Sequence, residues 1–151
     1  MISETSLKGI IVDLDGTLCD VDHRVEFVRK VPIDFKAFND RMGLDKVNHW
    51  CEELIQAMQA KNYQVHFVTG RGEDYRTLTE EWLQRHHIKY DSLLMRPRND
   101  MREDAEIKEE LYTQYIKGKV QILFVVDDRA SVVKRWRELG LVCLQCDWGD
   151  F

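Results

Sequence analysis

The chain has 151 residues, of which 44% are hydrophobic and 32% are charged, with a formal net charge of −5 at pH 7. This length fits one domain, residues 1–151, with a hydrophobic core of its own. The acidic balance argues against a protein that coats nucleic acid by charge alone, although it leaves room for a small basic site. No apolar run approaches the ~20 residues that span a bilayer. Residues 1–6 lack the features of a signal peptide, so we expect a cytoplasmic protein.

Apolar runs alternate with amphipathic segments along the chain. Continuous apolar runs predict strands at residues 9–13, 64–69, 92–95, 121–127 and 141–146. Apolar residues at helical spacing predict helices over 46–60, 73–87, 103–116 and 130–139. We expect Asp45 to be the N-cap of the first helix and Gly140 to end the last. The alternation predicts an α/β fold in three layers, a doubly wound parallel sheet with helices on both faces.

Three of the four tryptophans, Trp50, Trp82 and Trp136, lie at helical spacing and are interpreted as core residues. Trp148 lies after the last expected strand. Two interpretations of Trp148 remain open, a structural residue and a platform on which a nucleobase stacks.

Two carboxylates, Asp13 and Asp15, follow the first apolar run in the string Asp-Leu-Asp-Gly-Thr-Leu. Residues i and i+2 of an extended chain point to the same side, so both should project together from the end of a buried strand. Two like charges at such a short distance repel each other, which is unfavourable unless a cation or a shared proton compensates. The alternative is a pair of turn-forming aspartates. We favour a metal-assisted site.

Polar residues also follow two other apolar runs. Thr69, Gly70 and Arg71 come directly after the run at 64–69, and acidic residues end the run at 121–127. Ligands of open parallel sheets bind beyond the carboxyl ends of the strands. We therefore expect these side chains to converge with the first pair of aspartates at one edge of the sheet.

Four short motifs occur in a fixed order, namely Asp13-x-Asp15, Thr69, Lys108 and the pair Asp127-Asp128. Their order and their places at strand ends resemble the haloacid dehalogenase (HAD) superfamily, whose best-known members are aspartate-nucleophile phosphatases. The resemblance implies a HAD Rossmann-like fold. It also implies that Asp13 is the nucleophile of an aspartyl-phosphate intermediate and that Asp15 is general acid and then general base.

The same resemblance implies a bound Mg²⁺ as cofactor. Its ligands would be Asp13, the backbone carbonyl of Asp15, and the acidic pair of the fourth motif. Of that pair, we favour Asp128 as a direct ligand and Asp127 as a direct or water-linked one.

The phosphoryl oxygens would be bound by the Thr69 hydroxyl and the Gly70 amide, as the resemblance implies. Lys108 would neutralise the charge that develops on them. Lys117 and Lys119 are alternatives for that role.

A closer resemblance covers about residues 9–151. It is carried by Asp127-Asp128-Arg129 with the downstream Trp136-Arg137, by Arg24 eleven residues after Asp13, and by Arg71, Met95-Arg96 and Asp104. These residues are similar to the 3′-phosphatase domains of bifunctional phage polynucleotide kinase/phosphatases. The similarity implies a phosphatase that acts on polynucleotide 3′-phosphates, and on 2′,3′-cyclic phosphates, in DNA or RNA repair. The sequence holds no G-x-x-x-x-G-K-[ST] loop, so we expect no 5′-kinase activity from these residues. Whether a kinase or ligase partner works with this domain is left open by the sequence.

Arg24, Arg71 and Arg96 each carry a planar guanidinium group that pairs with phosphate oxygens. Three such groups near one site indicate a second phosphate or a strand, with Asp104 orienting one of them or Lys108. The alternative is that these arginines pair with acidic residues of the chain. A nucleoside monophosphatase is the alternative function, because its substrate would fit the same arginines.

Residues 19–44 lie between the first two motifs and are too few for a large cap domain. We expect a small cap-like insert of one or two short helices. An open site suits a macromolecular substrate, or an oligomer in which a neighbour supplies the lid. The sequence does not decide between DNA, RNA and mononucleotides, nor the oligomeric state.

Overall fold

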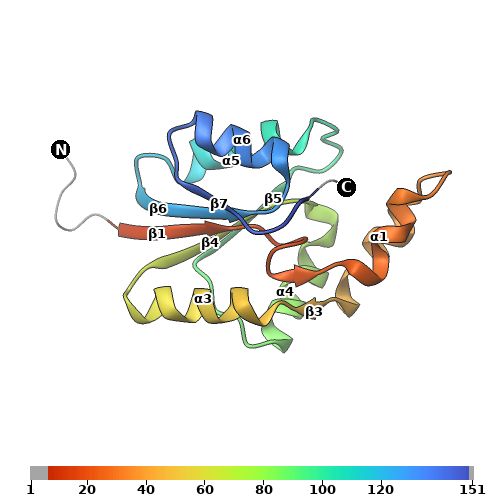
Figure 1. Cartoon of the computed structure of the whole chain (residues 1–151), viewed down its shortest axis with the longest axis horizontal. Coiled ribbons are helices and arrows are strands. Elements are labelled where there is room, and N and C mark those ends of the chain that lie inside the picture. The colour runs from red at the N-terminus through yellow and green to blue at the C-terminus, as the bar shows by residue number, and fades with distance from the viewer. Residues whose placement is uncertain (1–6, 150–151) are drawn as a thin grey trace.

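The structure, a computed structural model, describes residues 7–149 (Figure 1). Five strands form one sheet in the order β5-β4-β1-β6-β7, and every neighbouring pair in it is parallel. The strands are β1 (Leu7–Val12), β4 (Gln64–Gly72), β5 (Ser92–Arg96), β6 (Val120–Asp127) and β7 (Cys143–Gln145). This confirms the predicted parallel sheet.

Helices cover both faces of the sheet, which completes the three predicted layers (Figure 1). On one face, α3 (His49–Ala60) and α4 (Arg76–Arg85) pack against the strands. On the other face lie α5 (Asp104–Tyr115) and α6 (Ala130–Glu138). In β1, Ile10 and Val12 join the first core and Ile11 joins the second, which explains why the strand is an unbroken apolar run.

Two local predictions were wrong. The N-cap of α3 is Asn48 rather than Asp45, because Lys46–Val47 forms a short strand, β3, before the helix begins. Asp45 itself is buried. Trp50 is 47% exposed, whereas Trp82 and Trp136 are core residues as predicted. Trp50 lies in the first turn of α3, where Cys51 instead enters the core.

Residues 19–44 contain β2 (Cys19–Asp20), α1 (Asp22–Arg29), α2 (Phe35–Asp40) and the short 3-10 helix η1 (Met42–Leu44). β2 pairs with β3 in a separate antiparallel sheet. A second 3-10 helix, η2 (Glu73–Tyr75), precedes α4. In Figure 1, α1 projects from the end of the sheet at which the chain leaves β1.

Within residues 7–149, no helix is long and apolar enough to cross a membrane. The segment at 1–6, which carries the expectation about a signal peptide, lies outside the described residues, as do Asp150 and Phe151.

Candidate active site

The two central strands bring their acidic ends together. Asp13 follows β1 directly, and its backbone N–H donates to the carbonyl of Val126 in β6 (3.0 Å). Asp127 ends β6, and Asp128 follows it. The parallel register of β1 and β6 therefore places Asp13, Asp127 and Asp128 at one edge of the sheet.

These three aspartates form a first cluster, completed by a lysine from α5. One carboxylate oxygen from each of Asp13, Asp127 and Asp128 lies within 4.8 Å of the others. Lys108 Nζ donates to Asp13 Oδ1 (2.9 Å) and to Asp127 Oδ2 (2.8 Å). All four residues are buried. The Thr17 hydroxyl donates to the other oxygen of Asp13 (3.2 Å).

The buried charges of this first cluster do not balance. Burial, and then the negative charge of Asp127, raise the pKa of Asp13 well above its ordinary value. Burial is also the main reason why the pKa of Asp128 is raised to about 6. Burial lowers the pKa of Lys108, but the carboxylates of Asp127 and Asp13 outweigh it, so that the pKa lies above its ordinary range. Three carboxylates therefore face one fixed positive charge.

The donor set suits a hard divalent cation. Carboxylate oxygens are the ligands that Mg²⁺ takes in proteins, and a cation would compensate the surplus negative charge that one lysine leaves. In the turn after β1, the backbone at Gly16 lies very close to the Asp128 side chain. Gly16 has φ +82°, and a Cβ there would lie 2.2 Å from Asp128 Oδ2. Asp13, Asp127 and Asp128 are thus residues that could hold a metal.

We expect Gly16→Ala to lose activity because the added methyl group pushes the Asp128 carboxylate out of the cluster. Gly118→Ala is the matched control, since Gly118 has φ +81° and a Cβ there would meet nothing within 4 Å. Both variants should lose about 1–2 kcal/mol of stability from the left-handed backbone. Only Gly16→Ala should need a higher Mg²⁺ concentration for half-maximal activity, by roughly tenfold. Equal Mg²⁺ titrations of the two variants would contradict this account.

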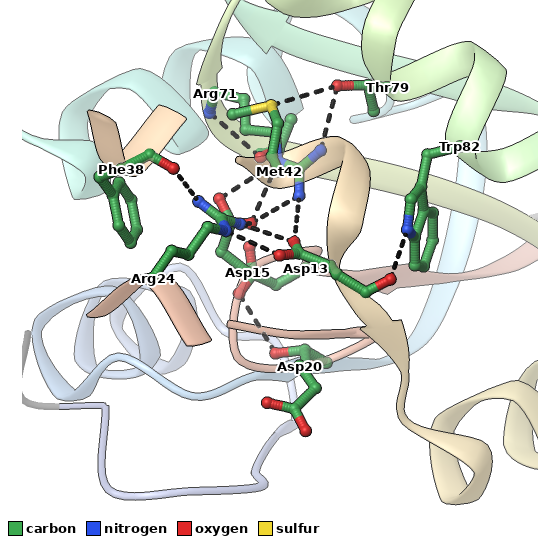
Figure 2. A network of polar contacts seen from close by, with 12 residues as sticks. Asp13, Asp15, Asp20, Arg24, Phe38, Met42, Arg71, Thr79 and Trp82 are labelled. Atoms are coloured by element: carbon green, nitrogen blue, oxygen red, sulfur yellow. Dashed lines mark hydrogen bonds and ion pairs between the residues drawn. The ribbon is translucent and has the colours of Figure 1, made fainter. Parts of the chain in front are cut away.

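A second buried cluster surrounds Asp15 (Figure 2). Arg24 Nη2 donates to Asp15 Oδ1 (2.6 Å), and Arg71 Nη2 donates to the same oxygen (2.7 Å). Both arginines also donate to Asp45, which lies deeper, through Arg24 Nη2 (2.7 Å) and Arg71 Nη2 (3.3 Å). Arg71 Nη1 reaches Thr79 Oγ1 of α4 (3.1 Å). Two carboxylates and two guanidinium groups balance in charge.

This pairing sets the protonation state of Asp15. Burial alone would raise its pKa, but Arg71 and Arg24 outweigh burial and hold the pKa of Asp15 well below its ordinary value. Asp15 is therefore a carboxylate in the resting structure. Asp15, Cys19 and Asp45 also have ligand atoms close together, but the two arginines already supply the positive charge that a metal would bring.

The structure gives Arg24 and Arg71 partners within the protein. Arg24 is fully buried, and Arg71 is 5% exposed. They hold Asp15 in place, and direct contact of either with a substrate phosphate stays a prediction. The contacts seen are those of the alternative interpretation, in which these arginines pair with acidic residues of the chain. Asp13 and Asp15, expected to project together, point into different clusters, because Asp15 lies in the turn beyond β1.

Sequence reasoning missed Asp45 as a member of the site. The segment before α3 looks like an ordinary helix N-terminus, which is why the sequence predicts a cap there. The backbone carbonyl of Asp45 accepts a hydrogen bond from Trp82 Nε1 (2.9 Å), and its side chain accepts from Arg24 Nε (2.8 Å). The available signal was indirect: a buried arginine needs more than one acceptor for its five N–H donors.

The remaining predicted residues lie around the end of β4. Thr69 is 1% exposed, and its hydroxyl accepts from the backbone N–H of Arg71 (3.1 Å). Arg96 donates to the carbonyl of Gly70 (2.9 Å) and pairs with Asp104. A Cβ on Gly70 would lie 2.6 Å from Asp104 Oδ1. Arg96 therefore ties the end of β4 to the start of α5, and its contact with substrate stays a prediction.

Comparison with known proteins identifies the family of the site. The sequence matches the family model described as the polynucleotide kinase PNKP phosphatase domain over residues 7–151. A protein of Autographa californica nuclear polyhedrosis virus named "Putative bifunctional polynucleotide kinase/RNA ligase" is 29% identical over 135 residues, which are 89% of this chain and 18% of that protein.

Solved structures agree with the family match. A chain in the "Structure of the Pnkp1/Rnl/Hen1 RNA repair complex" is 36% identical with a TM-score of 0.86, over 99% of this chain and 45% of that one. The class C acid phosphatase from Bacillus anthracis, solved with tungstate bound, has a TM-score of 0.61 at 16% identity, over 82% of this chain and 52% of that one. The latter likeness shows the fold alone. This chain spans less than half of the viral protein and of the RNA repair chain.

Proposed function

The chain belongs to the family of polynucleotide kinase phosphatase domains, and we propose that it is a Mg²⁺-dependent phosphatase that removes 3′-phosphates from polynucleotide ends. Family membership makes it a HAD-type phosphatase, a phosphoric monoester hydrolase. The observation that carries the proposal is the buried Asp13 carboxylate, which faces Lys108 and two further carboxylates next to the arginine-bound Asp15.

The proposed reaction has two steps. Asp13 attacks the phosphorus, the bond from phosphorus to the 3′-oxygen breaks, and Asp15 delivers the proton that the departing hydroxyl needs. A water molecule then attacks the aspartyl-phosphate, gives its proton to Asp15, and inorganic phosphate leaves. Mg²⁺, when held by Asp13, Asp127 and Asp128, would reduce the repulsion between the anionic nucleophile and the anionic ester.

The other polar residues are assigned by their places around Asp13. Lys108 already donates to Asp13 and would stabilise charge on the phosphoryl oxygens. We propose that the Thr69 hydroxyl and the Gly70 amide bind the same oxygens, since both lie at the end of β4 beside β1. Asp15 first needs a proton to act as an acid, because Arg24 and Arg71 favour its charged form. A substrate phosphate that competes for these arginines would raise its pKa.

We propose that residues 1–151 act as one phosphatase domain and that residues 19–44 are its cap-like insert. This insert holds two helices of 8 and 6 residues, which supports a site that remains open to a strand. The viral relative is named as a putative bifunctional polynucleotide kinase/RNA ligase, and the solved relative belongs to a Pnkp1/Rnl/Hen1 RNA repair complex. A kinase or ligase that works with this domain is therefore part of the proposal, as are 2′,3′-cyclic ends as a second substrate and action in the cytoplasm.

The test is phosphate release in Mg²⁺, with EDTA as the control. The substrates are an oligonucleotide 3′-phosphate, the same oligonucleotide with a 5′-phosphate, and free 3′- and 5′-mononucleotides. We expect kcat/KM to be highest for the oligonucleotide 3′-phosphate and activity to vanish in EDTA. A preference for mononucleotides would replace the proposal with the nucleoside monophosphatase alternative. Full activity in EDTA would refute the metal assignment.

A further inference from the structure

The segment after β7 runs along the acidic loop of the candidate site. The backbone N–H of Cys146 donates to the carbonyl of Asp127 (3.1 Å), and Gln145 Nε2 donates to the carbonyl of Asp128 (3.1 Å). Gly149 is packed so closely that a Cβ there would lie 2.2 Å from the Asp128 carbonyl oxygen. The chain from Gln145 to Gly149 is therefore held at the rim of the active site.

This segment carries Trp148, the most exposed tryptophan among the described residues. Trp148 is 86% exposed, whereas Trp82 and Trp136 are each 1% exposed. Among the described residues, Trp148 takes part in none of the ring contacts, which involve both of the buried tryptophans. An indole is the largest apolar side chain, and leaving it in water forgoes the stabilisation that its burial would give. Its exposure beside the acidic loop leaves a flat apolar face that a substrate could contact.

A positively charged side chain, that of Arg129, lies at the same rim. Gly149 also packs against Arg129, whose Cα would lie 2.6 Å from a Cβ on the glycine. The Arg129 side chain is 44% exposed, and its Nη1 is held by Asp104 Oδ2 (2.7 Å). Proteins that bind single strands combine cationic side chains for the backbone with aromatic rings on which bases stack. Arg129 and Trp148 bring both types to one side of the phosphate site.

We propose that Trp148 is the stacking platform for the base of the nucleotide that carries the 3′-phosphate. This inference rests on the proposed function and adds its recognition element. With the phosphate at Asp13, the attached sugar and base must extend from the site to its rim, where Gly149, the residue next to Trp148, packs against Asp128. Every base has a flat π-face, so the platform would favour nucleotide ends over phosphate esters without a base while tolerating any sequence.

The kinetic test compares two substrates and three variants. The substrates are an oligonucleotide 3′-phosphate and the same oligonucleotide with an abasic 3′-terminal residue. Trp148→Ala should raise KM for the intact substrate about tenfold and leave kcat within about twofold, because stacking binds the base and does no chemistry. Trp148→Phe should restore most of the affinity. The abasic substrate should have the same KM with the wild type and with Trp148→Ala. Trp50→Ala, a half-exposed tryptophan on α3, should behave as the wild type.

A binding measurement tests Trp148 without catalysis. An oligonucleotide with a 3′-hydroxyl should quench the tryptophan fluorescence of the wild type and of Trp50→Phe, but not that of Trp148→Phe. An unchanged KM of Trp148→Ala on the intact substrate would overturn the stacking role and leave the proposed function intact. Failure of the wild type to dephosphorylate any oligonucleotide would instead overturn the proposed function. In that case the fluorescence measurement alone tests the stacking role of Trp148. Quenching in the wild type supports this role, and the absence of quenching overturns it.

Discussion

We expect Asp13→Asn to abolish phosphate release, with kcat reduced by roughly 10⁴-fold or more. An amide cannot form the aspartyl-phosphate, whereas its oxygen can still accept from Lys108, which donates to Asp13 Oδ1 (2.9 Å) in the wild type. The measurement is kcat with the oligonucleotide 3′-phosphate, together with acid-quench trapping of phosphoprotein in the wild type and the variant. Activity that persists in Asp13→Asn would remove Asp13 as the nucleophile.

The same variant should be more stable than the wild type in the absence of Mg²⁺. Burial and the neighbouring Asp127 raise the pKa of Asp13, so the folded state binds this proton more tightly than the unfolded state. Stability therefore falls as the pH rises from the unfolded pKa to the folded pKa. The variant lacks this loss of stability. The difference in the free energy of unfolding between the variant and the wild type, measured in urea, should therefore be larger at pH 8 than at pH 5.

Asp34→Asn is the matched control for Asp13→Asn. Asp34 is an exposed N-cap of α2 whose side chain accepts from the backbone N–H of Ala37, and asparagine caps a helix as well as aspartate does. Its activity and its urea midpoint should match those of the wild type at both pH values. A pH-dependent gain in this control as well would assign the effect to net charge rather than to the buried cluster.

The second large effect is expected from Asp45→Asn. Asp45 is 3% exposed and accepts from both Arg24 and Arg71. Removal of one partner from a buried ion cluster leaves uncompensated charge, and we expect a loss of about 3–5 kcal/mol in the free energy of unfolding. The arginines would also lose the contacts that aim them at Asp15, which should lower kcat by about 10²-fold. Denaturant unfolding and steady-state kinetics measure the two effects.

Asp40→Asn is the control for this substitution. Asp40 pairs with Lys36 on the surface of α2 (2.6 Å), and exposed pairs contribute about 0–1 kcal/mol. The control should retain activity and lose at most that much stability. If Asp45→Asn unfolded at the same urea concentration as Asp40→Asn, the buried cluster would not stabilise the fold.

Sequence patterns sufficed for most of the architecture. The run near residues 9–13 is apolar on both faces because β1 is covered by helices on both sides, whereas in β6 only Val125, Val126 and Asp127 are buried. The apolar runs nevertheless predict both strands within about two residues of their bounds. The end of an apolar run suffices to single out Thr69, whereas Lys108 is preferred over Lys117 and Lys119 only through the resemblance to the polynucleotide phosphatase domains. The errors at Asp45 and Trp50 arose at the start of α3, where a two-residue strand precedes the helix.

What the sequence by itself determined was local, the periodicity of each element and the strand ends that carry polar residues. Only the tertiary structure decided which charge pairs with which. Lys108 meets Asp13 across 95 positions of the chain, and Arg71 meets Asp15 across 56. Such pairs form where sheet order and helix packing bring distant segments together, and burial then makes each partner necessary. Asp13 and Asp15, two positions apart, thus lie in two differently charged clusters.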